Sequence, residues 1–134
     1  MIELTRKGEY AVRGILYLAQ QPPGKVSLLG EIAESCDAPK TFLAKILQQF
    51  VKIGFVVSSR GTGGGFMLAR PAAEISLREV VEAVEGPIMP NRCLIAKGTC
   101  ERDATCPVHP VWERVRKDIV EILDSVTMED LARG

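Results

Sequence analysis

The sequence lacks most of what an enzyme or a membrane protein needs. Its 134 residues include one histidine, no pair of carboxylates in a recognisable motif and no cofactor fingerprint, so we expect no catalytic site. No window approaches the ~18 consecutive apolar residues of a membrane span. No long apolar run follows the basic residues of the start, MIELTRKGEYAVRG, so no signal peptide is predicted. We therefore expect a cytoplasmic protein that is not an enzyme and has no membrane partner.

The chain also lacks a net charge, because 17 basic and 17 acidic residues cancel. The charges are nevertheless unevenly distributed. Residues 1–70 carry nine Lys or Arg against five Asp or Glu, a net of +4, whereas residues 71–134 carry eight against twelve, a net of −4. The N-terminal half is therefore the candidate for contact with a polyanion.

Three of the four cysteines and the single histidine lie in one short stretch, CLIAKGTCERDATCPVH. Cys93, Cys100, Cys106 and His109 are spaced C-x6-C-x5-C-x2-H in a segment whose composition predicts a loop. Thiolate and imidazole ligands favour zinc, copper(I) or an iron-sulfur cluster. Zinc sites usually contain C-x2-4-C pairs, which are missing here, and the wider gaps favour a cluster. A disulfide with spare thiols is the alternative, which a reducing cytosol disfavours.

The N-terminal half predicts a helix-turn-helix. Apolar residues at three- and four-residue spacing indicate a helix over 5–20 with Thr5 as its N-cap. A short helix follows, with Ser27 as its expected N-cap and its end near Ser35 or Cys36. A third helix runs from Pro39 to Gly54. Its expected outward face consists of Thr41, Ala44, Lys45, Gln48 and Lys52, and it suits DNA phosphates and base edges or, alternatively, is only solvated.

The next segment, from Phe55 to Arg70, predicts a β-hairpin. FVVSS and FMLAR flank RGTGGG, in which Arg60 precedes a glycine-rich tip. Consecutive glycines permit positive backbone angles and close approach to another molecule. A phosphate-binding loop is disfavoured, because no GK[ST] is present and a strand follows the glycines. A hairpin directly after a helix-turn-helix is typical of a winged helix.

The C-terminal part predicts two further helices and a terminal turn. SLREVVEAVEG, capped by Ser76 and ended by Gly86, precedes the cysteine loop, and a long charged helix begins at Pro110. Its apolar residues are spaced three, four, three and four, which is the heptad pattern of a helix that pairs with a second copy. Packing on its own domain is the alternative. The seam consists of Trp112, Val115, Ile119, Ile122 and Val126.

The order of these motifs resembles the IscR/NsrR family of bacterial winged-helix iron-sulfur transcription regulators. LTRKGEYAVR, RGTGGGF, SLREVVEAVEG and the three cysteines with C-x2-H carry the resemblance over nearly the whole chain. It implies a homodimer that binds double-stranded DNA at a palindromic operator. It also implies that Cys93, Cys100 and Cys106 are thiolate ligands, with His109 as the preferred fourth ligand and Glu9 of the partner subunit as the alternative.

The resemblance implies a 2Fe-2S cluster, with 4Fe-4S as the alternative. The first cysteine gap is one residue longer than in the best-known IscR pattern, and Ala44 stands where a discriminating glutamate can occur, so operator preference is not carried over. Cys36 matches no ligand position and is interpreted as a small buried thiol.

The sequence therefore predicts a mainly α fold, a winged helix-turn-helix with a β-hairpin wing and a long C-terminal dimerisation helix. We assign 1–86 to the DNA-binding domain, 87–109 to the ligand loop and 110–134 to the dimerisation helix and terminal turn. The predicted function is a regulator that senses iron-sulfur status, redox state or nitric oxide. The alternatives are a zinc- or thiol-sensing regulator and a small electron-transfer protein. The predicted DNA contacts are Arg6, Lys7, Thr41, Lys45, Gln48, Arg60, Gly61, Gly63 and Gly64.

Overall fold

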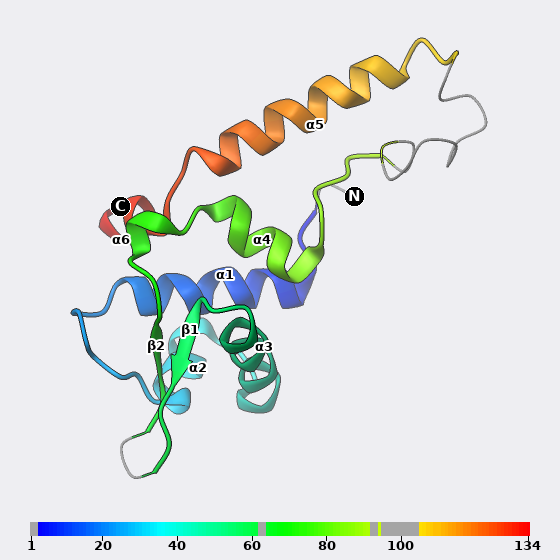
Figure 1. Ribbon diagram of the computed structural model, residues 1–134. Coiled ribbons are helices and arrows are strands. Elements are labelled where there is room, and N and C mark those ends of the chain that lie inside the picture. Colours follow the sequence, from blue (N-terminus) through cyan, green and yellow to red (C-terminus); the bar gives the residue numbers. More distant parts are fainter. Residues whose placement is uncertain (1–2, 62–63, 92–93, 95–104) are drawn as a thin grey trace.

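The computed structural model describes residues 3–61, 64–91, 94 and 105–134. The described part is mainly helical, with one antiparallel hairpin, as the sequence predicted (Figure 1). The elements in order are α1 Arg6–Ala19, α2 Leu29–Cys36, α3 Lys40–Lys52, β1 Val56–Ser58, β2 Phe66–Leu68, the 3-10 helix η1 Ala72–Glu74, α4 Leu77–Glu85, α5 His109–Asp124 and α6 Met128–Arg133. None of the helices within the described residues is long and apolar enough to cross a membrane.

The first three helices enclose the main hydrophobic core. Thr5 caps α1 as predicted, because its hydroxyl accepts a hydrogen bond from the Gly8 amide at 3.1 Å. The apolar residues of α1 that recur at helical spacing face α2 and α3, where burial of each large side chain stabilises the fold by about 1.5–3 kcal/mol. The fully buried residues of this core include Ile15, Ile32, Leu43, Ile46, Leu47 and Phe50.

The wing pairs with a third segment that the sequence did not predict. Val56 lies opposite Leu68 and Ser58 opposite Phe66 in the hairpin. Ser27 then forms an isolated bridge with Phe66, with backbone hydrogen bonds of 2.8 Å in both directions. The prediction that Ser27 caps α2 is therefore wrong. Its backbone is used by the sheet, and the N-cap position belongs to Leu28, whose amide donates to Glu31 Oε1 at 2.7 Å.

Helix α4 lies between α1 and α5 (Figure 1). Ser76 caps it as predicted, accepting from the Glu79 amide at 3.1 Å, and Gly86 ends it with a positive φ of 81°. Val80 and Val81 are buried. Helix α4 therefore covers the side of α1 that faces away from the wing.

Helix α5 projects from the rest of the molecule, and none of its described residues is fully buried. It begins at His109, one residue before the predicted start, and ends at Asp124. Val126 therefore lies beyond the helix, and its carbonyl accepts from the Leu77 amide at 2.8 Å. The expectation that the helix continues through Val126 is therefore wrong, whereas a role of Val126 in pairing stays a prediction.

The terminal helix α6 returns to the winged domain. Thr127 caps it, where the sequence predicted only a terminal turn, and pairs with Ser76 in an isolated bridge. The following Met128 is fully buried in the core between α1 and η1. The segment after α5 is therefore fixed to the body of the molecule, a contact that the sequence analysis did not anticipate.

Candidate metal centre and nucleic-acid interface

The exposed face of α3 is basic and polar. Thr41, Lys45 and Gln48 are exposed, as predicted, and α3 contains no acidic residue. Lys45 and Gln48 line a shallow surface depression together with Ala44, Gln49 and Lys52. No ion pair joins Lys45 to another described residue, so its charge is available to a ligand.

The wing presents Arg60 and Gly61 on the surface, while Gly63 lies outside the described residues. Gly64 and Gly65 have an internal role. A Cβ atom on Gly64 would lie 2.5 Å from the Ser59 carbonyl oxygen, and one on Gly65 would overlap the Ser27 carbonyl. These two glycines are therefore required where the hairpin closes on itself and on the segment before α2, independently of any bound molecule.

The start of α1 lies against the end of α4. Glu85 Oε1 accepts from both the backbone amide and the hydroxyl of Thr5. A Cβ atom on Gly8 would overlap this carboxylate, so only glycine allows the contact. A carboxylate over a helix N-terminus is also favoured by the helix dipole. The neighbouring Arg6 is exposed and Lys7 half-buried.

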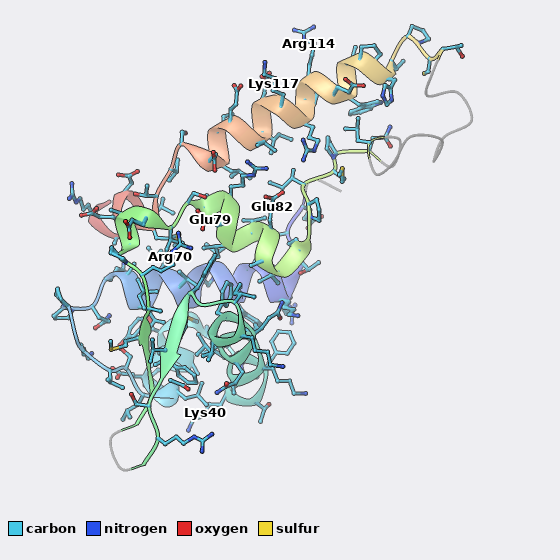
Figure 2. The ribbon with its side chains drawn as sticks, viewed as in Figure 1. Lys40, Arg70, Glu79, Glu82, Arg114 and Lys117 are labelled. Carbon is cyan, nitrogen blue, oxygen red and sulfur yellow. The ribbon has the colours of Figure 1, made fainter. Side chains whose placement is uncertain are left out.

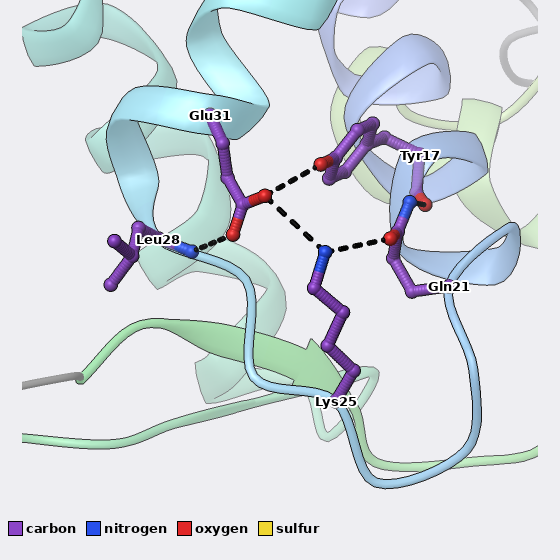
Figure 3. Close-up of polar contacts among 5 residues, drawn as sticks. All are labelled: Tyr17, Gln21, Lys25, Leu28 and Glu31. Carbon is purple, nitrogen blue, oxygen red and sulfur yellow. Dashed lines mark hydrogen bonds and ion pairs between the residues drawn. The ribbon is translucent and has the colours of Figure 1, made fainter.

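A polar cluster fixes the segment between α1 and α2 (Figure 3). The Tyr17 hydroxyl donates to Glu31 Oε2 at 2.9 Å, and Lys25 Nζ donates to the same oxygen at 3.3 Å and to Gln21 Oε1 at 2.9 Å. The Leu28 amide, followed by the Tyr17 hydroxyl, lowers the pKa of Glu31. The hydrogen bond to Glu31 in turn raises the pKa of Tyr17. These hydrogen bonds fix where α2 begins relative to α1.

Two of the four predicted cluster ligands belong to the described residues. Cys93 and Cys100 lie outside them, whereas Cys106 is a half-buried free thiol and His109 opens α5. The His109 amide donates to the Cys106 carbonyl at 3.2 Å, so one turn of chain joins the two residues. Within the described residues no group of three or more His, Cys, Asp or Glu side chains gathers as a metal site.

The imidazole of His109 uses only one of its nitrogens. Its Nε2 lies 2.7 Å from Glu113 Oε1, while Nδ1 is buried and has no hydrogen-bond partner among the described residues. A buried nitrogen without a partner costs free energy unless a ligand satisfies it. A histidine whose other nitrogen is held by a carboxylate is the usual arrangement of a metal ligand. The described part of the donor set therefore fits an iron or zinc centre.

The alternative fourth ligand, Glu9, lies in the first turn of α1 and is exposed. Its carboxylate forms no ion pair with another residue in the described ranges. The remaining cysteine, Cys36, is buried, and burial raises the pKa of its thiol. This confirms the interpretation of Cys36 as a packed thiol.

Hydrogen bonds connect α4, the start of the cysteine loop and α5. Glu82 Oε2 accepts from the Ile88 amide at 3.2 Å, and the Ile88 carbonyl accepts from Arg116 Nε at 2.9 Å. Arg78 also donates to Glu82, at 2.9 Å. Figure 2 shows Glu82 on the side of α4 that faces α5, whereas Arg114 and Lys117 point away from the body. Glu82, Glu113 and Arg116 were not predicted from the sequence. Contact between His109 and Glu113 could have been predicted, because residues four apart on a helix are neighbours.

The comparisons with known proteins agree with this architecture. The model of the Rrf2 family, described as an iron-dependent transcriptional regulator, matches residues 4–134. The transcriptional regulator IscR of Cronobacter sakazakii is 31% identical over 133 residues, covering 99% of this chain and 82% of the relative. The chain belongs to the Rrf2 family of transcriptional regulators. It is therefore a transcription regulator with a DNA-binding fold and not an enzyme, as the sequence predicted.

IscR and CymR are among the solved structures that are similar over nearly the whole chain. T. potens IscR is 29% identical with a TM-score of 0.79, and the match covers 98% of this chain and 86% of that one. CymR, the global cysteine regulator of B. subtilis, is 28% identical with a TM-score of 0.81, and the match covers 99% and 98% of the two chains. The same fold is thus found in IscR and in a regulator whose name refers to cysteine.

Proposed function

We propose that this protein is a homodimeric transcription regulator whose binding to a palindromic operator depends on a 2Fe-2S cluster held by Cys93, Cys100, Cys106 and His109. The observation that carries the proposal is the side chain of His109, which lies one turn after Cys106. Its Nδ1 is buried and has no hydrogen-bond partner within the described residues. When bound, the cluster would supply a centre whose presence and charge respond to iron-sulfur status, redox state or nitric oxide. A 4Fe-4S cluster and ligation by Glu9 of the partner subunit are the alternatives.

The DNA-binding role falls to the first 86 residues. Lys45, Thr41 and Gln48 project from α3, the second helix of the helix-turn-helix, which is the element that enters the major groove in this class of fold. Arg60 and the exposed Gly61 stand at the wing, where contact with the backbone or minor groove is expected, and Arg6 and Lys7 flank the start of α1. The wing tip, with Gly63, and the adjoining Gly64 complete the proposed surface.

The helix α5 is the proposed pairing element. Val111 and Ile122 are 49% and 64% exposed, and they lie eleven residues, or about three turns, apart on one face of the helix. Trp112, Val115 and Ile119 are half-buried beside them. A second copy of α5 would cover apolar side chains that the described part of one chain leaves in water. In this arrangement residues 87–109 hold the cluster, and α6 returns to the DNA-binding domain.

The connection through Ile88 supports a link between the cluster loop and the DNA-binding surface. Ile88, the second residue of the loop, hydrogen-bonds to both α4 and α5, and the last residue of α4 hydrogen-bonds to the N-cap of α1. Binding of the cluster orders its ligand residues and thereby biases how α4 and α5 are held. A coupling of about 1–3 kcal/mol corresponds to a change in operator affinity of about 5- to 150-fold.

The cluster is tested with protein purified without air. We expect brown protein that contains iron and acid-labile sulfide, and we expect Cys100→Ala to lose both while remaining folded. Cys36→Ala is the matched control, because this thiol is buried in the core and matches no ligand position. Wild-type protein that contains neither iron nor sulfide, even after reconstitution, would refute the proposal.

DNA binding is tested with Lys45→Ala. Loss of a groove contact should weaken operator binding by about 1–3 kcal/mol, measured by titration of labelled operator. Lys117→Ala removes the same charge from the outer face of α5 and should leave binding unchanged (Figure 2). Equal affinity of the wild type and the Lys45 variant would remove this residue from the interface.

The similarity to the B. subtilis cysteine regulator favours a second candidate, a regulator of the same fold that responds to thiols or zinc. Its prediction is a colourless protein whose operator affinity changes with thiol oxidation or with zinc. Metal analysis of the anaerobic preparation separates the two candidates before any DNA is added.

A further inference from the structure

We infer that Glu113 is a positioning residue for the metal centre: it accepts the Nε2 hydrogen of His109 and so fixes the imidazole tautomer that presents Nδ1 to iron. This inference rests on the proposed function, because it concerns how one ligand of that cluster is held. It assigns a role to a residue outside the cysteine and histidine ligand pattern.

The geometry of the pair favours one tautomer. His109 and Glu113 are separated by one turn of α5, and the distance from His109 Nε2 to Glu113 Oε1 is 2.7 Å. A carboxylate can only accept, so the hydrogen of the neutral ring lies on Nε2. Nδ1 then carries the lone pair. Because Nδ1 is buried and finds no acceptor among the described residues, a hydrogen placed there would stay unpaired, which reinforces the same assignment.

The position of the pair also restricts the ring. The His109 side chain is 19% exposed, whereas that of Glu113 is 60% exposed. The carboxylate therefore holds the ring from the solvent side, and the lone pair of Nδ1 is directed away from bulk water. A carboxylate on the second nitrogen also makes an imidazole a stronger donor to a metal.

The next turn of α5 connects this pair with the start of the loop. Arg116 donates to the Ile88 carbonyl at 2.9 Å. The first two turns of α5 thus carry a ligand, the residue that orients it, and a hydrogen bond to the segment that leads toward Cys93. Ring orientation at His109 is thereby fixed relative to both ends of the ligand loop.

The competing explanation is an ordinary four-residue pair that only stabilises the first turn of α5. Such a pair predicts a small change in helix stability and no effect on the metal. The two explanations differ most in the kinetics of cluster loss, which a pair that only stabilises the first turn of the helix would change little.

The test uses full-length protein reconstituted with iron and sulfide without air, in four forms: wild type, Glu113→Gln, Glu113→Ala and the control Glu121→Gln. Glu121 lies two turns further along α5, is exposed, and its side chain forms no ion pair with another residue in the described ranges. The first measurement is the rate of cluster loss to excess chelator, followed by absorbance. We expect loss about 10- to 100-fold faster in Glu113→Ala, an intermediate rate in Glu113→Gln, which still offers an acceptor oxygen, and the wild-type rate in Glu121→Gln.

The second measurement is the midpoint potential of the cluster, which should rise in Glu113→Gln because the uncharged amide makes His109 a weaker donor. Circular dichroism of each variant confirms that α5 remains helical. Wild-type rates and potentials in both Glu113 variants would overturn the inference and leave the cluster assignment intact. Wild-type protein without iron and sulfide would instead remove the proposed function and, with it, this inference.

Discussion

The contact between Gly8 and Glu85 gives the sharpest prediction about the fold. In Gly8→Ala the new methyl group would overlap Glu85 Oε1, so the carboxylate must leave Thr5 and give up its hydrogen bonds to the amide and the hydroxyl. A hydrogen bond to a charged group contributes about 1.5–3 kcal/mol, but both of these bonds are exposed, so we take about 1 kcal/mol for each and about 2 kcal/mol for the pair. Against this loss, alanine in place of glycine stabilises a helix by about 0.5–1 kcal/mol.

The two terms predict a change of sign between two backgrounds. In the wild type, Gly8→Ala should destabilise the protein by about 1 kcal/mol, which is about 4 °C in Tm for a chain of this size. In Glu85→Ala, where no carboxylate stands in the way, the same change should stabilise it by about 0.5–1 kcal/mol. The difference between the backgrounds, about 2 kcal/mol, is the coupling between the two residues.

The assay is thermal unfolding of cluster-free protein, followed by circular dichroism at one protein concentration, because pairing of chains would make Tm depend on concentration. Gly14→Ala is the control. It lies on the same helix, a Cβ there would meet Leu43 at an ordinary 3.5 Å, and it should stabilise both backgrounds equally. Additive effects of Gly8→Ala and Glu85→Ala would refute the account of how α1 and α4 are joined.

Three further predictions follow from the same structure. Met128→Ala, at a fully buried position, should cost about 2–5 kcal/mol, whereas Met67→Ala, on the half-buried wing strand, should lower Tm less; equal losses would show that α6 is not part of the core. The Leu28 amide and the Tyr17 hydroxyl lower the pKa of Glu31 below its ordinary value of 4.5, so the contribution of Glu31 to stability is complete above that pH and is lost as the pH falls through the lowered pKa. The difference in unfolding free energy between wild type and Glu31→Gln should therefore shrink on acidification. A difference that stays constant with pH would contradict this explanation. Arg116→Ala should bring the operator affinities of cluster-loaded and cluster-free protein closer together, whereas Arg114→Ala, on the outer face of α5, should preserve their ratio.

The helices that bury one face could be predicted from the sequence, because apolar residues spaced three and four apart share one face only when the segment is an α-helix, and that face can then be buried in a core. The N-caps Thr5, Ser76 and Thr127 were predictable for the same reason: each precedes such a pattern and satisfies an amide that the helix leaves free. Ser27 shows the limit of this reasoning. It also precedes a helical pattern, but a contact with Phe66, far away in the sequence, competes for its backbone and prevails.

The candidate site divides in the same way. The ligand types and their spacing were visible in the sequence, since soft donors in one loop already indicate a metal. The orientation of His109 was not, because it depends on the rotamer that brings Nε2 to Glu113 and leaves Nδ1 buried. Gly64 was interpreted from its place near the wing tip, yet the close approach of Ser59 alone would require a glycine there.

The position of α4 suggests why a change in the cysteine loop would reach the DNA-binding surface. Its Ala83 carbonyl accepts from Gln49 Nε2 of α3 at 3.0 Å, its last residue holds the start of α1, and Glu82 holds the amide of Ile88. Contact alone does not establish coupling, since energy passes between sites only where an element has two arrangements that both sites bias. Helix α4 is short: Val80 and Val81 are buried, Leu77, Ala83 and Val84 pack half-buried against the core, and side-chain hydrogen bonds at or near the surface complete its attachment. Because α6 fixes the far end of α5 to that core, displacement at the loop would pivot α5 about its C-terminal end, and in a dimer paired through α5 the pivot would alter the separation of the two α3 helices.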